Sequence, residues 1–284
     1  MDFQTPQSTG VPPAESESSR GSAKQFDPAA PEHSSPVSPQ QFDTAVLEPS
    51  TASPQQLGLR LFAGRHHARY IEADVPAHVI CRVFQGRYML TPTPELNELI
   101  VGVLGRGLSL YGSIQLYAIA VLSNHMHLML SGTPDHVSGF MGFVKREISR
   151  RWGTQPDVNW PGAMWEESRM TALPTAQSQQ RCLEYILAHG VKEHLVERPQ
   201  QWPGIHCAKS LLTGKSLRGR WLDATSFGRA VRAEARKLPS NRRQINRCDY
   251  EHAQQVILSP IPAWRCLDAA ERQERIRSMV ATIV

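Results

Sequence analysis

Cysteine is scarce in this sequence, and no two cysteines stand close together. Five cysteines are spread over 284 residues, their number is odd, and no Cys-x-x-Cys pair occurs. Such a pattern argues against a disulfide framework and against a cysteine zinc site, and it favours a reducing compartment. The five are Cys81, Cys182, Cys207, Cys248 and Cys266.

Long apolar runs are absent as well. The longest, from Leu116 to Leu122, is far too short to span a bilayer. The first residues, Met1 to Gln4, lack the basic and apolar regions of a signal peptide. We therefore expect a cytoplasmic protein with no membrane partner.

Large apolar residues are few in the first part of the chain. Residues 1–57 are instead rich in Pro, Ser, Gln and Ala. A segment of this composition buries too little apolar surface to offset the entropy cost of ordering it. The sequence therefore predicts a disordered tail over residues 1–57.

Acidic charge is concentrated in the same tail, and the rest of the chain is basic. Residues 1–50 carry seven acidic and two basic side chains, a net charge of −5, whereas the whole chain carries +5. The remainder therefore carries +10, which suits a polyanionic partner such as nucleic acid. A soluble basic protein without such a partner would have the same charge, so charge alone leaves both interpretations open.

Alternating and helical apolar patterns follow one another over residues 58–214. Alternation predicts strands at Ala77 to Phe84, at Ser113 to Leu122 and from His125 onward, and we expect a further strand within Trp160 to Pro174. Helical spacing predicts helices over Pro92 to Gly107, Pro134 to Trp152 and Gln177 to Gly190. This order favours an α+β fold, with a mainly antiparallel central sheet and helices packed on one face.

The last part of the chain shows a different composition. Residues 215–284 contain many arginines and lysines, and Ala269 to Val280 has helical spacing. The sequence predicts a basic, partly helical extension here, which either adds contacts to nucleic acid or is a solvated tail.

The strand that begins at His125 carries two histidines on one face. Side chains alternate along a strand, so His125, His127 and Met129 face one way and the residues between them face the other. Ser123 and Asn124 form a plausible tight turn before this strand. Two imidazoles one pleat apart can reach the same metal ion. The alternative is two histidines on a half-buried strand that bond only to their neighbours.

The helix over Gln177 to Gly190 carries a tyrosine and a histidine away from its apolar stripe. Tyr185 and His189 are four residues apart, so they lie side by side on one flank of a helix. A tyrosine needed only for packing would more naturally join the stripe. The alternatives are a packing tyrosine and a surface or capping histidine.

Together these segments resemble the HUH single-strand DNA transposases with one catalytic tyrosine, which include the insertion-sequence and REP-associated tyrosine transposases. In that family a His-hydrophobic-His strand follows a Ser-Asn or Pro-Asn turn, as Ser123 to His127 does. The family's Tyr-Ile-x-x-Asn-Pro-Val segment corresponds to Tyr185 to Val191, and its early His and Arg correspond to His78 and Arg82. The resemblance covers about residues 60–214.

Two positions depart from the family's pattern. His189 stands where the family uses a polar amide as its third metal ligand, although imidazole can also bind a divalent ion. Gly190 stands where proline is usual, and we expect this exchange to loosen the end of the helix.

The resemblance implies an HUH fold, a ferredoxin-like or RRM-like sandwich, and a defined chemistry. His125, His127 and His189 would hold a divalent metal ion, Mg²⁺ or Mn²⁺, and Tyr185 would attack a phosphate of single-stranded DNA to give a 5′-phosphotyrosyl intermediate. The DNA would contain hairpins. Family members differ in whether the tyrosine serves its own subunit or a partner's, so a homodimer stays open. The expected DNA-contacting residues are Arg82, Lys145, Arg146, Arg150 and Arg169.

Two other functions remain compatible with the sequence. A DNA-binding regulator would keep the fold and lack cleavage, and the exchange at His189 and Gly190 leans toward it. A metal-dependent hydrolase of a small substrate would use the histidines without Tyr185, but no acidic general base lies close to the histidine motif.

Overall fold

The computed structural model describes residues 72–155 and 158–284. The predicted tail, residues 1–57, lies outside the described part of the chain. No helix among the described residues has both the length and the apolar character needed to cross a membrane.

A four-stranded antiparallel sheet is the centre of the fold, in the order β2-β3-β1-β4. Its strands are β1 (Ala77–Arg82), β2 (Gln115–Leu122), β3 (His125–Ser131) and β4 (Arg169–Ala172). Helix α1 (Pro94–Leu110) joins β1 to β2, and α2 (Pro134–Trp152) joins β3 to β4. This βαββαβ arrangement is ferredoxin-like, so the predicted α+β fold with an antiparallel central sheet is confirmed.

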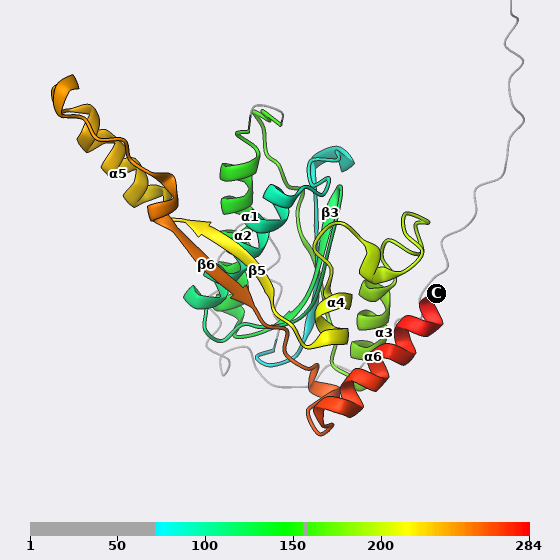
Figure 1. Ribbon diagram of the computed structural model, residues 1–284. Coiled ribbons are helices and arrows are strands. Elements are labelled where there is room, and N and C mark those ends of the chain that lie inside the picture. The colour runs from blue at the N-terminus through cyan, green and yellow to red at the C-terminus, as the bar shows by residue number, and fades with distance from the viewer. Residues whose placement is uncertain (1–71, 156–157) are drawn as a thin grey trace, which may run out of the picture. The chain divides into compact units, whose positions relative to one another are not determined.

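Both faces of the sheet are covered by helices, so the prediction of helices on one face is wrong. Every residue of β2 except Gln115 is buried, and every residue of β3 except His125. A sheet that is apolar on both faces must be covered on both to bury that surface. Figure 1 shows α1 and α2 on one side and α3 (Ala176–Leu187) and α4 (Cys207–Thr213) on the other.

Local capping signals fix where the helices begin. The Thr93 hydroxyl accepts a hydrogen bond from the Leu96 amide at the start of α1, and Pro94 occupies the first turn. Thr175 and Ser178 form a reciprocal capping box at the start of α3.

The C-terminal residues pack closely on the rest of the domain. β5 (Leu217–Leu222) and β6 (Glu251–Val256) form a two-stranded antiparallel sheet that lies against α1. A Cβ on Gly102 would lie 1.9 Å from the carbonyl oxygen of Arg220, so this strand reaches the helix only because a glycine is there. The helices in this region are α5 (Ala224–Ala235) and α6 (Ala269–Ile283), the latter packed on α4 and α3.

Short 3-10 turns complete the described chain. They are η2 (Phe84–Gly86), η3 (Pro199–Gln201), η4 (Pro239–Asn241), η5 (Arg247–Tyr250) and η6 (Pro262–Trp264).

Candidate active site

The β2–β3 hairpin places His125 and His127 on the same face of the sheet. His125 lies opposite Arg82 of β1, and His127 lies opposite Ile80, with the two imidazole centroids 4.8 Å apart. The turn between the strands is Ser123-Asn124, as predicted. The face that carries these histidines is the one covered by α3.

Each of the two imidazoles is held through its Nδ1 atom. His125 Nδ1 lies 2.6 Å from Asn124 Oδ1, and His127 Nδ1 lies 2.9 Å from His78 Nε2. His127 Nε2 is buried and has no hydrogen-bond partner in the part of the chain that the structure describes. A buried polar atom without a partner is costly and indicates a ligand or function.

The third histidine, His189, lies just beyond α3, whose cap is Ala188. Its side chain is 2% exposed, and its Nδ1 lies 2.9 Å from Glu193 Oε1. The other Glu193 oxygen accepts a 2.6 Å hydrogen bond from the Gly190 amide. One carboxylate therefore fixes both the imidazole and the turn that follows the helix.

The expectation that Gly190 loosens the helix end is wrong. Gly190 has a φ of +88°, a conformation that glycine adopts readily, and its carbonyl accepts hydrogen bonds from the Leu195 and Val196 amides. Proline at this position could neither adopt this φ nor donate to Glu193, because its φ is fixed near −65° and it has no N–H. Glycine here closes a tight turn.

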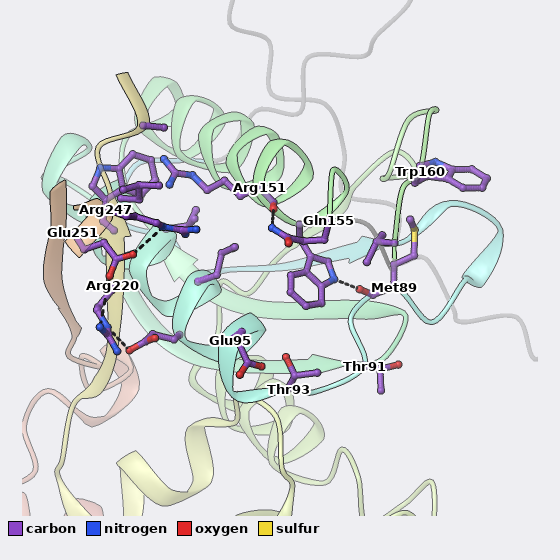
Figure 2. Close-up of a pocket in the computed structure, with 18 of the residues that line it drawn as sticks. Met89, Thr91, Thr93, Glu95, Arg151, Gln155, Trp160, Arg220, Arg247 and Glu251 are labelled. Carbon is purple, nitrogen blue, oxygen red and sulfur yellow. Dashed lines mark hydrogen bonds and ion pairs between the residues drawn. The ribbon is translucent and has the colours of Figure 1, made fainter. Parts of the chain in front are cut away.

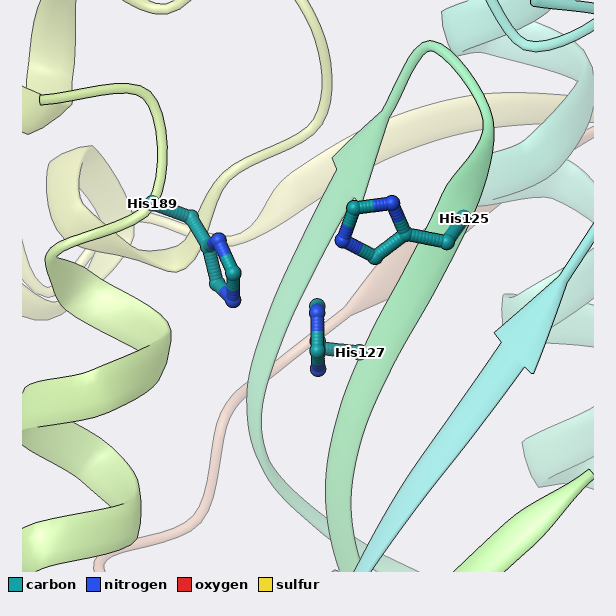
Figure 3. A group of neighbouring side chains, drawn as sticks. All are labelled: His125, His127 and His189. Carbon is teal, nitrogen blue, oxygen red and sulfur yellow. The ribbon is translucent and has the colours of Figure 1, made fainter. Parts of the chain in front are cut away.

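The three histidines come together at one point in the structure. One nitrogen atom from each of His125, His127 and His189 lies within 4.8 Å of the others, and Figure 3 shows the rings converging from the hairpin and from the end of α3. The rings of His127 and His189 stack with centroids 4.1 Å apart. This arrangement fits a divalent metal ion bound by three imidazoles.

Burial keeps these imidazoles neutral, which is the form that binds a metal. It lowers the pKa of His189 and of His78 to about 4, and nearby Lys192 adds to both shifts. Burial also lowers the pKa of His125 and of His127, and neighbouring histidines lower that of His127 further. The ligand nitrogens are therefore unprotonated at neutral pH.

Tyr185 lies at the edge of the histidine cluster. Its ring centroid is 4.8 Å from that of His189 and 5.6 Å from that of His127. The side chain remains 45% exposed, so a substrate can reach it. The Lys192 ammonium lies 3.6 Å from the centre of the Tyr185 ring and 3.4 Å from His189 Nε2.

The five basic residues expected to contact DNA are divided between the two sides of the sheet. Arg82 pairs across the strands with His125, and Arg169 pairs with Ile80, so both lie on the histidine face. The other three are on α2, on the side of the sheet opposite the histidines. Lys145 donates a hydrogen bond to Ser168 there, and Arg146 and Arg150 form ion pairs with Glu147.

Four residues of the site contact the histidine cluster or Tyr185 in ways that the sequence did not predict. They are His78, Asn124, Lys192 and Glu193. Alternation along β1 places His78 on the same face as Arg82, and Glu193 follows His189 by four residues, so both positions carried a weak signal. Nothing in the sequence predicted that Lys192 would fold back over Tyr185, because that contact depends on the turn at Gly190.

This chain is similar to known proteins in structure. No protein-family model and no curated protein matches this chain. A solved REP-associated tyrosine transposase bound to a REP hairpin is similar, with 16% identity, coverage of 52% of this chain and 86% of that one, and a TM-score of 0.44.

Two further solved structures show a weaker similarity. A candidate transposase from Deinococcus radiodurans has 21% identity, covers 43% of this chain and 95% of its own, and has a TM-score of 0.30. A bacterial tRNA(His) guanylyltransferase-like protein in complex with ATP has 9% identity, coverage of 74% and 92%, and a TM-score of 0.30.

Proposed function

We propose that this chain is a metal-dependent, transposase-like endonuclease that nicks and rejoins single-stranded DNA through a 5′-phosphotyrosyl intermediate. The observation that carries the proposal is the position of the exposed Tyr185 ring, 5.6 Å from the buried His127 ring of the histidine cluster. Cleavage through a covalent phosphotyrosyl intermediate requires a nucleophile next to a set of metal ligands.

The residues present fit a divalent metal ion. Within the described residues His127 Nε2 is buried without a partner, and Asn124, His78 and Glu193 each hold a cluster imidazole through its Nδ1 atom. Such outer partners fix the tautomer and the direction of a ligating imidazole. A metal ion held by His125, His127 and His189 would supply positive charge to a nonbridging oxygen of the scissile phosphate.

Tyr185 is the proposed nucleophile. Its hydroxyl oxygen forms a bond to phosphorus and loses its proton, and the bond from phosphorus to the 3′ oxygen breaks. The departing 3′ oxygen takes up a proton, which leaves a free 3′-hydroxyl and a 5′-phosphotyrosyl enzyme. Attack by a different 3′-hydroxyl reverses the step and joins the strands, so no nucleotide cofactor is consumed.

Single-stranded DNA, with hairpins, is the proposed partner. Arg82 and Arg169 lie on the histidine face and can contact phosphates beside the reacting one. The Lys192 ammonium, next to both Tyr185 and His189, adds a further cation at this point. We assign Lys145, Arg146 and Arg150 to contacts away from the site, because they lie across the sheet.

A covalent-capture experiment tests the proposal. The protein is incubated with hairpin-bearing single-stranded oligonucleotides that have randomised flanking bases, together with Mn²⁺ or Mg²⁺, and is resolved under denaturing conditions. We expect an adduct that retains a 3′ label and not a 5′ label, because the enzyme stays on the 5′ phosphate of the downstream fragment. Tyr185→Phe abolishes the adduct, whereas Tyr250→Phe, at a half-buried tyrosine in the C-terminal region, keeps it.

Two results would contradict the proposal. Cleavage that persists in Tyr185→Phe would assign the histidines to a hydrolase that does not use the tyrosine. An adduct that retains the 5′ label would mean that the opposite bond is broken.

A DNA-binding regulator without cleavage is the second candidate, and one observation favours it. The Lys192 ammonium lies 3.4 Å from His189 Nε2, the atom that would bind the metal, and an ammonium there opposes a second cation. The same experiment separates the two functions, because a regulator would bind the oligonucleotides and give no adduct in either metal.

A further inference from the structure

We infer that a groove on the α1–α2 side of the domain binds unpaired bases of the nucleic acid strand that occupies the histidine site. The groove has a volume of about 950 Å³ and lies between α1, the end of α2, the loop after β1 and strand β5 (Figure 2). This inference rests on the proposed function for the identity of the strand. It adds a second binding site that contains none of the residues assigned to catalysis.

Aromatic rings with arginines stacked on them line the groove. Tyr88 is 74% exposed, and the Arg87 guanidinium lies 4.4 Å from the centre of the Trp160 ring. At the other end, the Arg151 guanidinium lies 3.8 Å from the Trp221 ring. Exposed aromatic faces and arginine planes are the surfaces on which unpaired bases stack, in proteins that bind single strands.

Some of the arginines that line the groove are paired with acidic residues of the described chain, and one is not. Arg220 pairs with Glu98 and Glu251, and Arg247 also pairs with Glu251, so the cations near β5 are neutralised. Among the described residues, the Arg87 guanidinium has no acidic partner, and its hydrogen bond goes to the side-chain oxygen of Gln85. A cation that is free to meet a phosphate therefore lies beside Trp160 and Tyr88, which assigns this end of the groove to the strand.

The same end of the groove adjoins the histidine site. Asn124, which holds His125, donates from its Nδ2 to the Gly86 carbonyl, and the Leu90 amide donates to the Ser123 carbonyl. The loop that carries Arg87 and Tyr88 is thus fastened to the turn before His125. A strand whose phosphate reaches the histidines can pass over this turn and place its next bases in the groove.

The form of the ligand follows from these contacts. Stacking on Tyr88 and Trp160 requires free base faces, which a duplex does not present. Glu95 lines the same groove, and its carboxylate can accept hydrogen bonds from exocyclic amines such as that of cytosine. We therefore expect single-stranded DNA to bind here, and duplex DNA to bind without dependence on Trp160.

Equilibrium binding of a 20-nucleotide oligo-dT to the full chain tests the inference. The measurements use Tyr185→Phe as the background, so that no cleavage interferes. We expect Trp160→Ala to weaken binding by about 5- to 100-fold, the usual effect of removing one stacking ring. Trp160→Phe restores most of the affinity because it keeps an aromatic face, and Lys237→Ala, a loss of charge on the exposed segment after α5, changes it little.

An abasic oligonucleotide of the same length separates stacking from charge. Binding by the protein with Trp160 falls when the bases are removed, and the fall is much smaller in Trp160→Ala, where only Tyr88 remains for stacking at this end of the groove. Two results would overturn the inference: an equal loss of affinity on removing the bases in both proteins, or an affinity of Trp160→Ala for the normal oligonucleotide that equals that of the protein with Trp160, with the fold intact by circular dichroism. The two proposals can fail separately. Base-dependent binding through Trp160 without a covalent adduct would support the groove and contradict the proposed enzyme activity. A covalent adduct with binding that does not depend on Trp160 would support the enzyme activity and contradict the groove.

Discussion

Replacing Glu193 by alanine is expected to weaken divalent metal binding at the histidine site by about 10- to 100-fold, the usual effect of losing the residue that orients a ligating histidine. Glu193 is the only acidic partner of His189 among the described residues, at 2.9 Å from its Nδ1. Without it, His189 can rotate or change tautomer, and its Nε2 is no longer fixed toward the other two ligands.

The size of the effect follows from what the carboxylate holds. Besides His189, it accepts the Gly190 amide at 2.6 Å and lies 3.6 Å from the Lys192 ammonium. Partial burial alone would raise the pKa of Glu193, but the hydrogen bonds from Gly190 and His189 lower it, so the group is ionised at neutral pH. Because its side chain is 34% exposed, we expect a change in affinity rather than a loss of the fold.

Calorimetric titration of Mn²⁺ into metal-stripped protein measures this effect. Glu193→Gln should give an intermediate loss of Mn²⁺ affinity, since its single amide oxygen cannot accept hydrogen bonds from both His189 and Gly190 as the two carboxylate oxygens do. Glu197→Gln is the matched control, because it removes the same charge four residues further on. Unchanged affinity in Glu193→Ala, or an equal loss in Glu197→Gln, would refute the assignment of Glu193 as the residue that positions His189.

Three further predictions concern the same site. Mn²⁺ should support more adduct formation than Mg²⁺ at equal concentration, because three imidazoles suit a softer ion than one that prefers oxygen; equal rates would contradict an all-histidine ligand set. Lys192→Ala should raise Mn²⁺ affinity several-fold in the same titration, since it removes an ammonium 3.4 Å from His189 Nε2, and a decrease would show that the lysine supports the site. Gly190→Ala should lower the free energy of unfolding by about 1–3 kcal/mol in urea titrations, because alanine must adopt a φ of +88°, and unchanged stability would show that the turn is not strained by a side chain.

The sequence carried most of the information about the sheet and the hairpin. Period-two alternation predicted the strands around His125 and His127, and the turn at Ser123-Asn124 predicted their pairing, because both signals are local. Tyr185 and His189 are neighbours, as their spacing of four residues predicted, although α3 ends at Leu187 and His189 lies just beyond it. Alternation did not predict that helices cover both faces of the sheet. That arrangement depends on how many buried residues each strand contributes to either face.

The contacts that the sequence did not reveal are the ones that join distant segments. His78 and His127 are 49 residues apart and meet only when β1 pairs with β3. The Trp221 end of the groove needs β5 to lie against α1, which depends on close backbone approach at Gly102. Neither arrangement has a periodic signature in the chain, and both arise from tertiary packing.

The exchange of residues at His189 and Gly190 is best understood together with Glu193. An amide ligand needs little outside help to present its oxygen, whereas an imidazole must have the correct tautomer and direction, which a carboxylate on Nδ1 provides. Glu193 reaches His189 only because the chain turns back at Gly190, and the Gly190 amide that proline would lack is itself bonded to that carboxylate. His189, Gly190 and Glu193 therefore form one connected arrangement, in which the turn at Gly190 brings the carboxylate to the imidazole and so gives the proposed metal ligand its direction.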